Sequence, residues 1–378
     1  MSIIEIHAIH SFPPAALNRD QNGGPKTTRF GGTERARISS QALKRPAREL
    51  LKTQIEQGDS NLSTGIRSRN VAGHIVAHYH IPGANEDAQR ALVEAVLNKA
   101  GLLDGKELVL LSRWEIEQIA EAITNHPQAH NAISPDGKPD VKVCAAIAGD
   151  PKCPSKTPGT VLHGLATNRV EAADVAAFGR MLAGARHLDV QAAVQVAHAI
   201  GVSKLVADID YFTVVEDLAE EAGVEQVGGI GERGFNTSVF YRYSAVDVRE
   251  LTRNLTGASN HTDVDAEQQV QAAKLAAIVT ECLIRAVPKA GATAHGHVTL
   301  PDSVLVTIAD SQPTNLVGAF ERPIGFEADN SDPTTVRATR RLLVYHDRLH
   351  GIYGTSPAGK LITVTEFDQT ELPTGVET

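Results

Sequence analysis

The residues with the clearest chemical potential are the basic side chains crowded into one stretch near the start of the chain. Between Asn18 and Lys52 there are nine basic and three acidic residues, a local charge of +6, whereas the whole chain carries −9. Arginine side chains and the backbone amides of glycine-rich loops are groups that bind phosphate. This stretch therefore predicts a surface that holds a polyanion by its phosphates. Its basic members are Arg19, Lys26, Arg29, Arg35, Arg37, Lys44, Arg45, Arg48 and Lys52.

A serine-capped helix follows the glycine-rich loop and offers a second kind of anion contact. Ser39 and Ser40 are typical helix caps, and the free amides at the start of such a helix favour a negative charge. Pro46 either bends this helix or begins a second one, and the sequence leaves both alternatives open. The candidate contacts on the first turns are Gln41, Lys44 and Arg45.

An acidic segment further along the chain has the opposite preference. Residues 206–225 contain seven carboxylates and no lysine or arginine. Such a segment suits a basic surface, so it predicts head-to-tail contact with the basic stretch of another copy of the chain. The alternative is that a run of like charges only keeps a surface solvated. The candidate contact residues are Asp208, Asp210, Glu216 and Asp217.

The remaining motifs define no catalytic site. Fifteen histidines form no metal-binding pattern, and the closest pair is His295 with His297. Gly229 to Gly234 match G-x-G-x-x-G, but we expect an acidic helical stretch before them and a strand after them, the reverse of the dinucleotide-binding order. We therefore interpret these glycines as a hinge and assign no catalytic residue, metal or cofactor. An oligomeric metal enzyme with a histidine site is the runner-up hypothesis.

Two further groups are candidates for contact with nucleic acid. Met181 follows Phe178-Gly179-Arg180, where it is either core filler or an apolar wedge between bases. A segment with five prolines, residues 134–160, is interpreted as a long mobile excursion. It carries Lys138, Lys142, Lys152 and Lys156. Aromatic residues make up only 4% of the chain, and Tyr241 and Tyr243 are predicted to pack in a sheet, so phosphates would dominate any nucleic-acid contact.

Hydrophobic periodicity places these residues on an α+β protein. Strands are predicted at residues 2–10, 236–243 and 303–308. Helices are predicted between Asn85 and Gly101, over residues 189–200, and over residues 275–286 before Pro288. Strands near both ends with helices between them indicate a sheet domain interrupted by a helical insertion.

Composition points to the reducing cytoplasm. Three cysteines match no zinc or redox spacing and leave an odd thiol after any pairing. The N-terminus has no basic region before its apolar run, and the chain has no stretch of eighteen uncharged apolar residues. We therefore expect neither export nor a membrane span.

Eight short motifs follow one another along the chain and carry a family resemblance. They are Leu17-Asn18-Arg19-Asp20, Phe30-Gly31-Gly32, Arg35-Ala36-Arg37-Ile38-Ser39-Ser40-Gln41, Leu43-Lys44-Arg45, Phe178-Gly179-Arg180-Met181, Ala197-His198-Ala199-Ile200, Asp208-Ile209-Asp210 and Val239-Phe240-Tyr241-Arg242-Tyr243. Together they resemble the CasC family of backbone subunits of the type I-E CRISPR Cascade complex. Pro46 and Glu34 depart from the family pattern.

The resemblance implies an α+β fold with an RRM-like (ferredoxin-like) palm, a helical fingers insertion and a protruding thumb hairpin. The implied segments are 1–59 for the first part of the palm, 60–186 for the fingers, 187–201 for a palm helix, 202–234 for the thumb, 235–365 for the second part of the palm and 366–378 for a loose tail.

The resemblance also implies a non-catalytic function. In the family, copies of the subunit form a hexameric backbone along the spacer of a CRISPR RNA, beside other Cascade subunits. They hold the RNA backbone without reading sequence and present bases to target DNA in antiviral defence. A stand-alone RNA-binding protein without a filament is a third hypothesis.

Each implied role falls on particular residues. RNA contacts are implied for Arg19, Lys26, Arg35, Arg37, Ser39, Ser40, Gln41, Lys44, Arg45, Arg48, Arg180 and Met181. The resemblance does not extend to the loop that carries Lys138, Lys142, Lys152 and Lys156, and nonspecific contact of these lysines with target DNA is a separate hypothesis. Subunit contacts are implied for Asp208, Asp210, Glu216 and Asp217 of the thumb.

Overall fold

The chain forms two compact units. The structure is a computed structural model that describes residues 3–58, 62–82, 85–103, 108–134, 137–150, 152, 158–165, 170–182, 184–206, 208–215, 227–258, 263–310, 312–325, 332–355, 357–364 and 372–377. Unit 1 comprises Met1–Leu50, Gln195–Val246 and Val279–Thr378, and unit 2 comprises Leu51–Val194 and Asp247–Ile278. The expected α+β class is confirmed.

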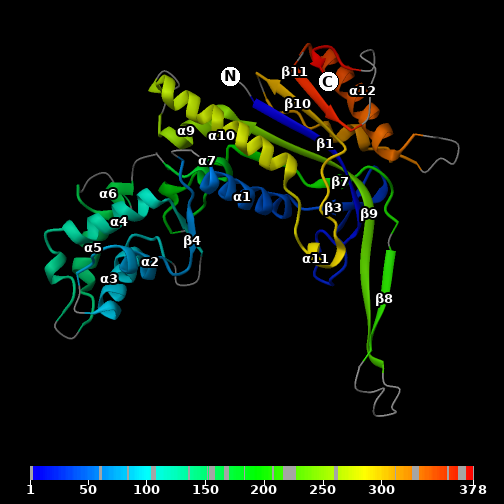
Figure 1. Cartoon of the computed structure of the whole chain (residues 1–378). Coiled ribbons are helices and arrows are strands. Elements are labelled where there is room, and N and C mark those ends of the chain that lie inside the picture. The colour runs from blue at the N-terminus through cyan, green and yellow to red at the C-terminus, as the bar shows by residue number, and fades with distance from the viewer. Residues whose placement is uncertain are drawn as a thin grey trace. The chain divides into compact units, whose positions relative to one another are not determined.

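Unit 1 is built around one large mixed sheet (Figure 1). Its strands are β1 (Ile3–Ala15), β2 (Thr27–Phe30), β3 (Thr33–Ile38), β6 (Val194–Val196), β7 (Ala199–Gly201), β8 (Asp208–Val215), β9 (Val227–Asp247), β10 (Ser303–Ala309), β11 (Ala358–Thr363) and β12 (Val376–Glu377). The order is β12-β11-β10-β1-β9-β7-β3-β2, with β6 and β8 also paired to β9. The three strands predicted from periodicity are confirmed as parts of β1, β9 and β10.

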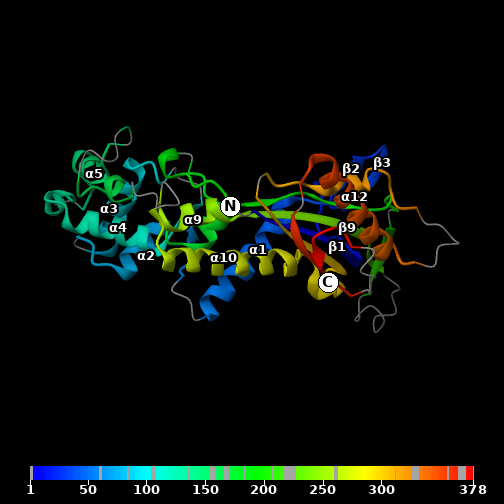
Figure 2. The ribbon, with the colours of Figure 1, turned by 90° about the horizontal axis from the view of Figure 1, so that it is seen from above.

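Helical elements cover the two faces of this sheet. On one face, Ile9 and Tyr241 pack with Phe320 of η5 (Leu316–Phe320) and Leu342 of α12 (Thr334–Tyr353). Figure 2 shows α12 beside β1 and β9. On the other face, buried apolar residues of β1, β3 and β9 pack with Leu43 of α1 (Ser40–Gln57). Alternate residues of β1 and β9 therefore face different helices.

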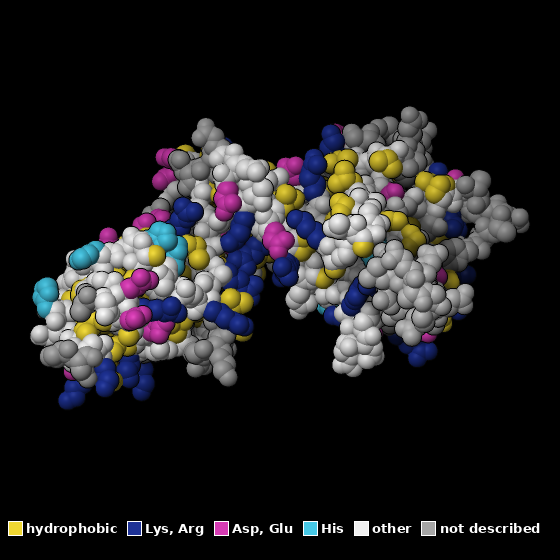
Figure 3. Space-filling model, turned by 60° about the horizontal axis from the view of Figure 1, so that its bottom comes forward, with side chains coloured by type: hydrophobic (Ala, Val, Ile, Leu, Met, Phe, Trp, Pro, Cys, Tyr) yellow, Lys and Arg dark blue, Asp and Glu magenta, His cyan; other side chains and the backbone are white. Residues whose placement is uncertain are grey.

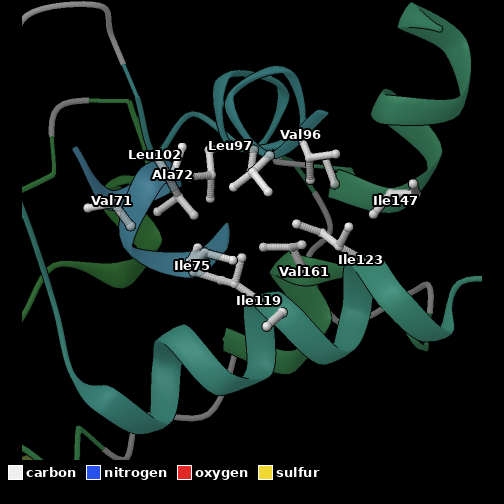
Figure 4. Packing of buried hydrophobic residues seen from close by; sticks show 14 of the residues in the cluster. Val71, Ala72, Ile75, Val96, Leu97, Leu102, Ile119, Ile123, Ile147 and Val161 are labelled. Carbon is white, nitrogen blue, oxygen red and sulfur yellow. The ribbon is translucent and has the colours of Figure 1, made fainter. Parts of the chain in front are cut away.

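Unit 2 is mainly helical. Its helical elements are α2 (Val71–His78), α3 (Glu86–Lys99), α4 (Arg113–Asn125), η1 (Ala129–Asn131), α5 (Val141–Ala148), α6 (Val161–Leu165), α7 (Ala173–Phe178), η3 (Arg186–Leu188), α9 (Val248–Thr256) and most of α10 (Ala266–Arg285). A short ladder joins β4 (Ile66–Ser68) to β5 (Val109–Leu111). In Figure 4, side chains from α2, α3, α4, α5 and α6 meet in one apolar core.

Capping residues explain where two of these helices begin. Asn85 Oδ1 accepts the amide of Ala88, which confirms the predicted start of α3. Ser112 and Glu115 form a reciprocal capping box at α4. Within the described part of the chain, no helix combines the length and the apolar composition that a membrane span requires.

The segment expected to form the thumb is an antiparallel hairpin for as far as it is described. The register runs from Asp208↔Phe235 to Phe212↔Gly231, and Figure 1 shows the hairpin continuing beyond the sheet. A Cβ on Gly231 would lie 2.3 Å from the Phe212 ring, so the glycine permits the aromatic ring to cross the ladder. Residues 216–226 lie outside the described residues.

This hairpin corrects two expectations about the acidic segment. The helical stretch expected before G-x-G-x-x-G is wrong for residues 208–215, which are strand β8. The glycines themselves lie inside the continuous strand β9, so they are not a hinge. Ile209, Tyr211, Phe212 and Thr213 are β-branched or aromatic residues that favour a strand, and β8 forms by pairing with β9.

The palm helix expected at 187–201 is also wrong. The short helix η3 ends at Leu188, and the segment then forms β6 and β7. Its apolar residues fit a strand as well as a helix, and the backbone bonds of Ala197 to Tyr243 and of Val202 to Val239 select the strand. Pairing with β9 decides the conformation, because a short segment takes its structure from its neighbours.

Three smaller expectations change as well. The excursion expected at 134–160 contains α5, which begins at the Asp140 cap and buries Cys144. The tail expected to be loose ends in β12, which pairs with β11 and buries Val376. The helical unit also extends beyond residues 60–186, because α9 and most of α10 belong to it.

Candidate nucleic-acid interface

The loop of residues 18–26 is a compact turn held by its own backbone. Asp20 N donates to Gly24 O at 2.8 Å, and the Asp20 carboxylate accepts the amides of Asn22 and Gly24 at 2.8 and 3.0 Å. A bridge between Arg19 and Pro25 closes the turn. Asp20 therefore organises the loop, and the exposed Arg19 belongs to an ordered turn.

Asn18 ties this loop to the start of α1. Its carbonyl accepts the Lys26 amide at 2.8 Å, and its Oδ1 accepts the Ser39 amide at 2.9 Å. Arg19, Lys26 and the helix start are thereby held in one region of unit 1. Sequence reasoning had assigned no role to Asn18; the only signal for it was its place beside Arg19 in a motif.

Arg37 extends the same region across the sheet. Its amide donates to Lys26 O at 2.9 Å, and its Nε donates to Thr27 O at 3.2 Å. Its Nη1 lies 3.0 Å from His198 Nδ1. Burial, followed by the charges of Arg37 and Lys26, lowers the pKa of His198. Sequence reasoning had also missed His198 as a member of this site.

The first turns of α1 present the helical candidates. Gln41 and Arg45 are exposed, and Arg45 pairs with Glu49 at 2.9 Å. Lys44 is half-buried, and burial lowers its pKa. Arg48 is half-buried and has interactions within the chain.

Pro46 lies inside α1 and does not divide it. The helix continues to Gln57, and the proline ring is buried. The alternative of a second helix that begins at Pro46 is therefore wrong. The proline removes one backbone donor, but the apolar ring packs on the core side of the helix.

The expected RNA contact of Arg35 is wrong, because this side chain is fully buried. Its Nε donates to Thr33 Oγ1 at 2.7 Å, and its Nη1 donates to Gly201 O at 2.8 Å. Its Nη2 donates to the carbonyls of Phe320 and Glu321 at 3.1 and 3.0 Å. Arg35 therefore joins β3 to β7 and η5, and supports the basic surface without contacting a ligand.

The β2–β3 turn lies close to the carbonyl of Glu321, so a larger residue at the turn should destabilise the protein. Gly31 has φ 56°, and a Cβ there would lie 1.6 Å from Glu321 O. Because this backbone cannot yield cheaply, we expect Gly31→Ala to lower the free energy of unfolding of unit 1 by about 3 kcal/mol. Chemical denaturation of the full chain measures this loss.

Gly32→Ala is the matched control. Gly32 also has a positive φ, 76°, but open space around its Cβ position. This substitution should cost only about 1 kcal/mol, the penalty of the left-handed backbone. Equal losses in the two variants would contradict the steric explanation.

Arg180 is a second structural arginine, and its expected contact with RNA is also wrong. Its Nη1 lies 2.7 Å from Glu115 Oε2, and both side chains are buried. Nη2 donates to Leu188 O at 2.9 Å, and Nη1 also reaches Leu110 O at 3.2 Å. The guanidinium thus joins three segments of unit 2.

Met181 lies next to this buried arginine but points to the surface. Its side chain is 82% exposed, which excludes the alternative of core filler. The backbone on either side is fixed, because Arg180 pairs with Val190 and the Leu182 amide donates to Asp189 at 2.6 Å. An apolar side chain held at the surface by a rigid backbone suits a contact with an apolar partner.

Three of the four candidate lysines of unit 2 lie within the described residues. Lys138, Lys142 and Lys152 are exposed, and Lys142 lies on the first turn of α5. Lys156 lies outside the described residues. Figure 3 shows lysine and arginine side chains scattered over the visible face, with acidic side chains close to several of them. The distribution of charge on this face does not by itself mark an interface. The candidate interface is therefore defined by where the individual basic residues lie in the fold.

The acidic candidates are described only in part. Asp208 and Asp210 are exposed on β8, and Asp210 lies opposite Arg233 of β9. Glu216 and Asp217 lie outside the described residues.

The histidine pair proposed for a metal enzyme is held by other contacts. His295 packs edge-on against Phe235, with ring centroids 5.0 Å apart. The buried His297 lies with Nε2 2.9 Å from Pro288 O, which fixes that nitrogen as a donor. Among the described residues, no three histidine, cysteine or acidic side chains are placed to hold a metal ion.

The fold places this chain among α+β proteins with a large mixed sheet. A family model described as "CT1975-like protein" matches residues 4–377. The chain therefore belongs to this family, and the resemblance recognised in the sequence is confirmed.

Solved structures agree with this assignment. A chain titled "CRISPR RNA-guided surveillance complex, pre-nicking" is 26% identical with a TM-score of 0.76, covering 100% of this chain and 96% of that chain. A second, titled "CRISPR RNA-guided surveillance complex", is 22% identical with a TM-score of 0.60, covers 100% and 94%, and supports the fold alone. A comparison with curated proteins gives no match.

Proposed function

We propose that the protein is a non-catalytic backbone subunit of a type I-E Cascade surveillance complex in the cytoplasm. It polymerises along the spacer of a CRISPR RNA and holds the RNA backbone. The observation that carries this proposal is the basic region around Asn18, in a chain that matches subunits of RNA-guided complexes along its whole length. Family membership supports the same conclusion.

The phosphate contacts follow from the geometry of unit 1. Arg19 and Lys26 belong to one ordered loop, and Ser40 and Gln41 begin the adjoining helix, which Ser39 precedes with its amide bonded to Asn18. Cations and helix-start amides bind phosphate oxygens and carry no sequence information. Bases of the guide would then stay free to pair with target DNA.

We further propose that the palm is RRM-like. Four strands in the order β10-β1-β9-β7, with α1 and α10 as the connections, support a ferredoxin-like core. RRM domains stack bases on exposed aromatic residues of the sheet. Here Tyr241 and Tyr243 are buried in the core that includes η5 and α12. Base stacking on these tyrosines is therefore excluded, and RNA binds through its backbone at the loop and the start of α1.

The remaining roles complete the proposed assembly. The thumb hairpin, with the exposed Asp208 and Asp210, contacts a neighbouring copy. Met181 is the wedge against a base, and the exposed lysines of unit 2 contact target DNA without sequence preference. Other Cascade subunits complete the particle and carry any cleavage.

Arg19→Ala tests the phosphate contacts. We expect RNA affinity to fall by about tenfold for every spacer sequence, because a charge-assisted contact is lost. The slope of log affinity against log salt should fall by about one unit. Fluorescence titration at several salt concentrations measures both quantities.

Arg90→Ala is the control for the change in net charge. Arg90 is half-exposed in unit 2 and pairs with Glu94 at 3.0 Å. This variant should bind like the unsubstituted protein. A change in spacer preference with an unchanged salt slope in Arg19→Ala would argue against backbone recognition.

A further inference from the structure

His198 lies in the candidate interface without an assigned role. It immediately precedes β7, where Ala199 pairs with Ile38 and Ile200 pairs with Arg37. His198 and Arg37 are therefore diagonal neighbours on one face of the sheet. Lys26 lies opposite Arg37, because the Arg37 amide donates to Lys26 O at 2.9 Å. Lys26, which precedes β2, Arg37 of β3 and the exposed His198 are thus successive neighbours across the sheet.

The contact with Arg37 fixes the tautomer of His198. Arginine has donors and no acceptor, so the 3.0 Å contact from Arg37 Nη1 requires an unprotonated Nδ1 on His198. The proton of the neutral ring must then be on Nε2. Burial and the charges of Arg37 and Lys26 lower the pKa of His198, which favours this neutral ring at pH 7.

The donor on Nε2 remains available to a ligand. Among the described residues, the hydrogen bonds of the His198 ring engage Nδ1 alone. A neutral donor beside two cations suits an oxygen of a phosphate that those cations attract. Because the ring carries no charge, its contact adds a hydrogen bond but releases no counterion.

We propose that His198 Nε2–H donates to a phosphate oxygen of the bound RNA, beside contacts from Lys26 and Arg37. This inference rests on the proposed function. It adds an uncharged hydrogen-bond donor to a phosphate site whose other side chains are cations. It separates two effects of the site on RNA: the cations set the salt dependence, and His198 adds affinity at constant salt dependence.

Two substitutions of His198 separate RNA contact from positioning of Arg37. His198→Asn keeps an acceptor at the position of Nδ1 and removes the Nε2 donor. His198→Gln places an amide donor near the position of Nε2 and leaves no acceptor at the position of Nδ1. We expect His198→Asn to lower affinity for single-stranded RNA about fivefold with an unchanged salt slope. His198→Gln should stay within about twofold of the unsubstituted protein.

Arg37→Ala is the charged comparison, and it should lower both the affinity and the salt slope. If His198→Gln loses affinity and His198→Asn does not, His198 only positions Arg37 and the proposal is wrong. A lower salt slope in His198→Asn would also overturn it, because the ring would then be charged. Melting temperatures of the variants show whether each one is folded.

The two proposals fail in different ways. If the unsubstituted protein binds no RNA, or if Arg19→Ala has no effect, the proposed function itself is wrong and this inference falls with it. If Arg19→Ala behaves as expected and both His198 variants match the unsubstituted protein, only the role of His198 is wrong.

Discussion

Arg180→Ala is expected to lower the free energy of unfolding of unit 2 by about 3–5 kcal/mol. The substitution leaves the Glu115 carboxylate buried without its cation, and it removes a donor from Leu188 O and Leu110 O. An uncompensated buried charge costs far more than the loss of a surface ion pair. The chain's single tryptophan, Trp114 on α4, lies next to Glu115, so its fluorescence during urea denaturation reports on this unit.

Two variants make this prediction specific. Arg90→Ala removes the exposed pair with Glu94 and should cost no more than about 0.5 kcal/mol. Arg180→Met combined with Glu115→Leu removes both charges and should recover much of the loss. If Arg180→Ala is no more destabilising than Arg90→Ala, Arg180 does not have the structural role assigned to it.

Acid should destabilise unit 1 through three buried histidines. Burial is the main cause that lowers the pKa of His7 to about 3, of His10 to about 2 and of His346 to about 4. Because the unfolded rings titrate near pH 6.5, only the unfolded state gains these protons as the pH falls from 7 to 5. Each ring should therefore remove about 2 kcal/mol of stability over that interval. Chemical denaturation followed by circular dichroism at both pH values measures the total.

His346→Leu isolates one of these contributions. Both ring nitrogens of His346 are buried without a hydrogen-bond partner among the described residues, so leucine should be tolerated at pH 7. The loss between pH 7 and pH 5 should be smaller by about 2 kcal/mol than in the unsubstituted protein. Burial raises the pKa of Glu5, which acts in the opposite sense, but this effect is common to both proteins. An unchanged pH dependence would show that His346 titrates normally in the folded state.

The sequence indicated a basic stretch but did not separate its exposed members from its buried ones. Arg35 and Arg37 are two residues apart on β3 and share a face of the sheet. Arg35 is buried because η5, nearly three hundred residues later, places the carbonyls of Phe320 and Glu321 over it. Contacts so distant in sequence leave no local pattern, and arginine composition alone suggests a ligand contact in both cases.

Secondary structure shows the same limit. Long periodic segments such as α3 and β1 were predictable, because their apolar positions and the Asn85 cap are local signals. The short strands β7 and β12 were not, because they exist through pairing with β9 or β11. His198 could not be predicted as a member of the site for the same reason, because only the register between β3 and β7 brings it to Arg37.

The sequence motifs define the family, and the structure defines which residues of the motifs are exposed. The ordered motifs predicted the family, which the match over residues 4–377 confirms. The structure then removes Arg35 and Arg180 from the ligand-contacting residues and adds Asn18 as the residue that organises the site. The proposed RNA site is therefore smaller than its motif, and its core is the loop of residues 18–26 with the start of α1.

The backbone function is tested most directly by the mass of the particle that the protein forms with and without its RNA. The chain is co-expressed with Cascade partner subunits in the presence or absence of a CRISPR transcript, and the particle mass and the length of bound RNA are recorded. We expect a multi-copy particle that forms only with the transcript and protects RNA of spacer length. A monomer or small oligomer free of RNA in both preparations would contradict it.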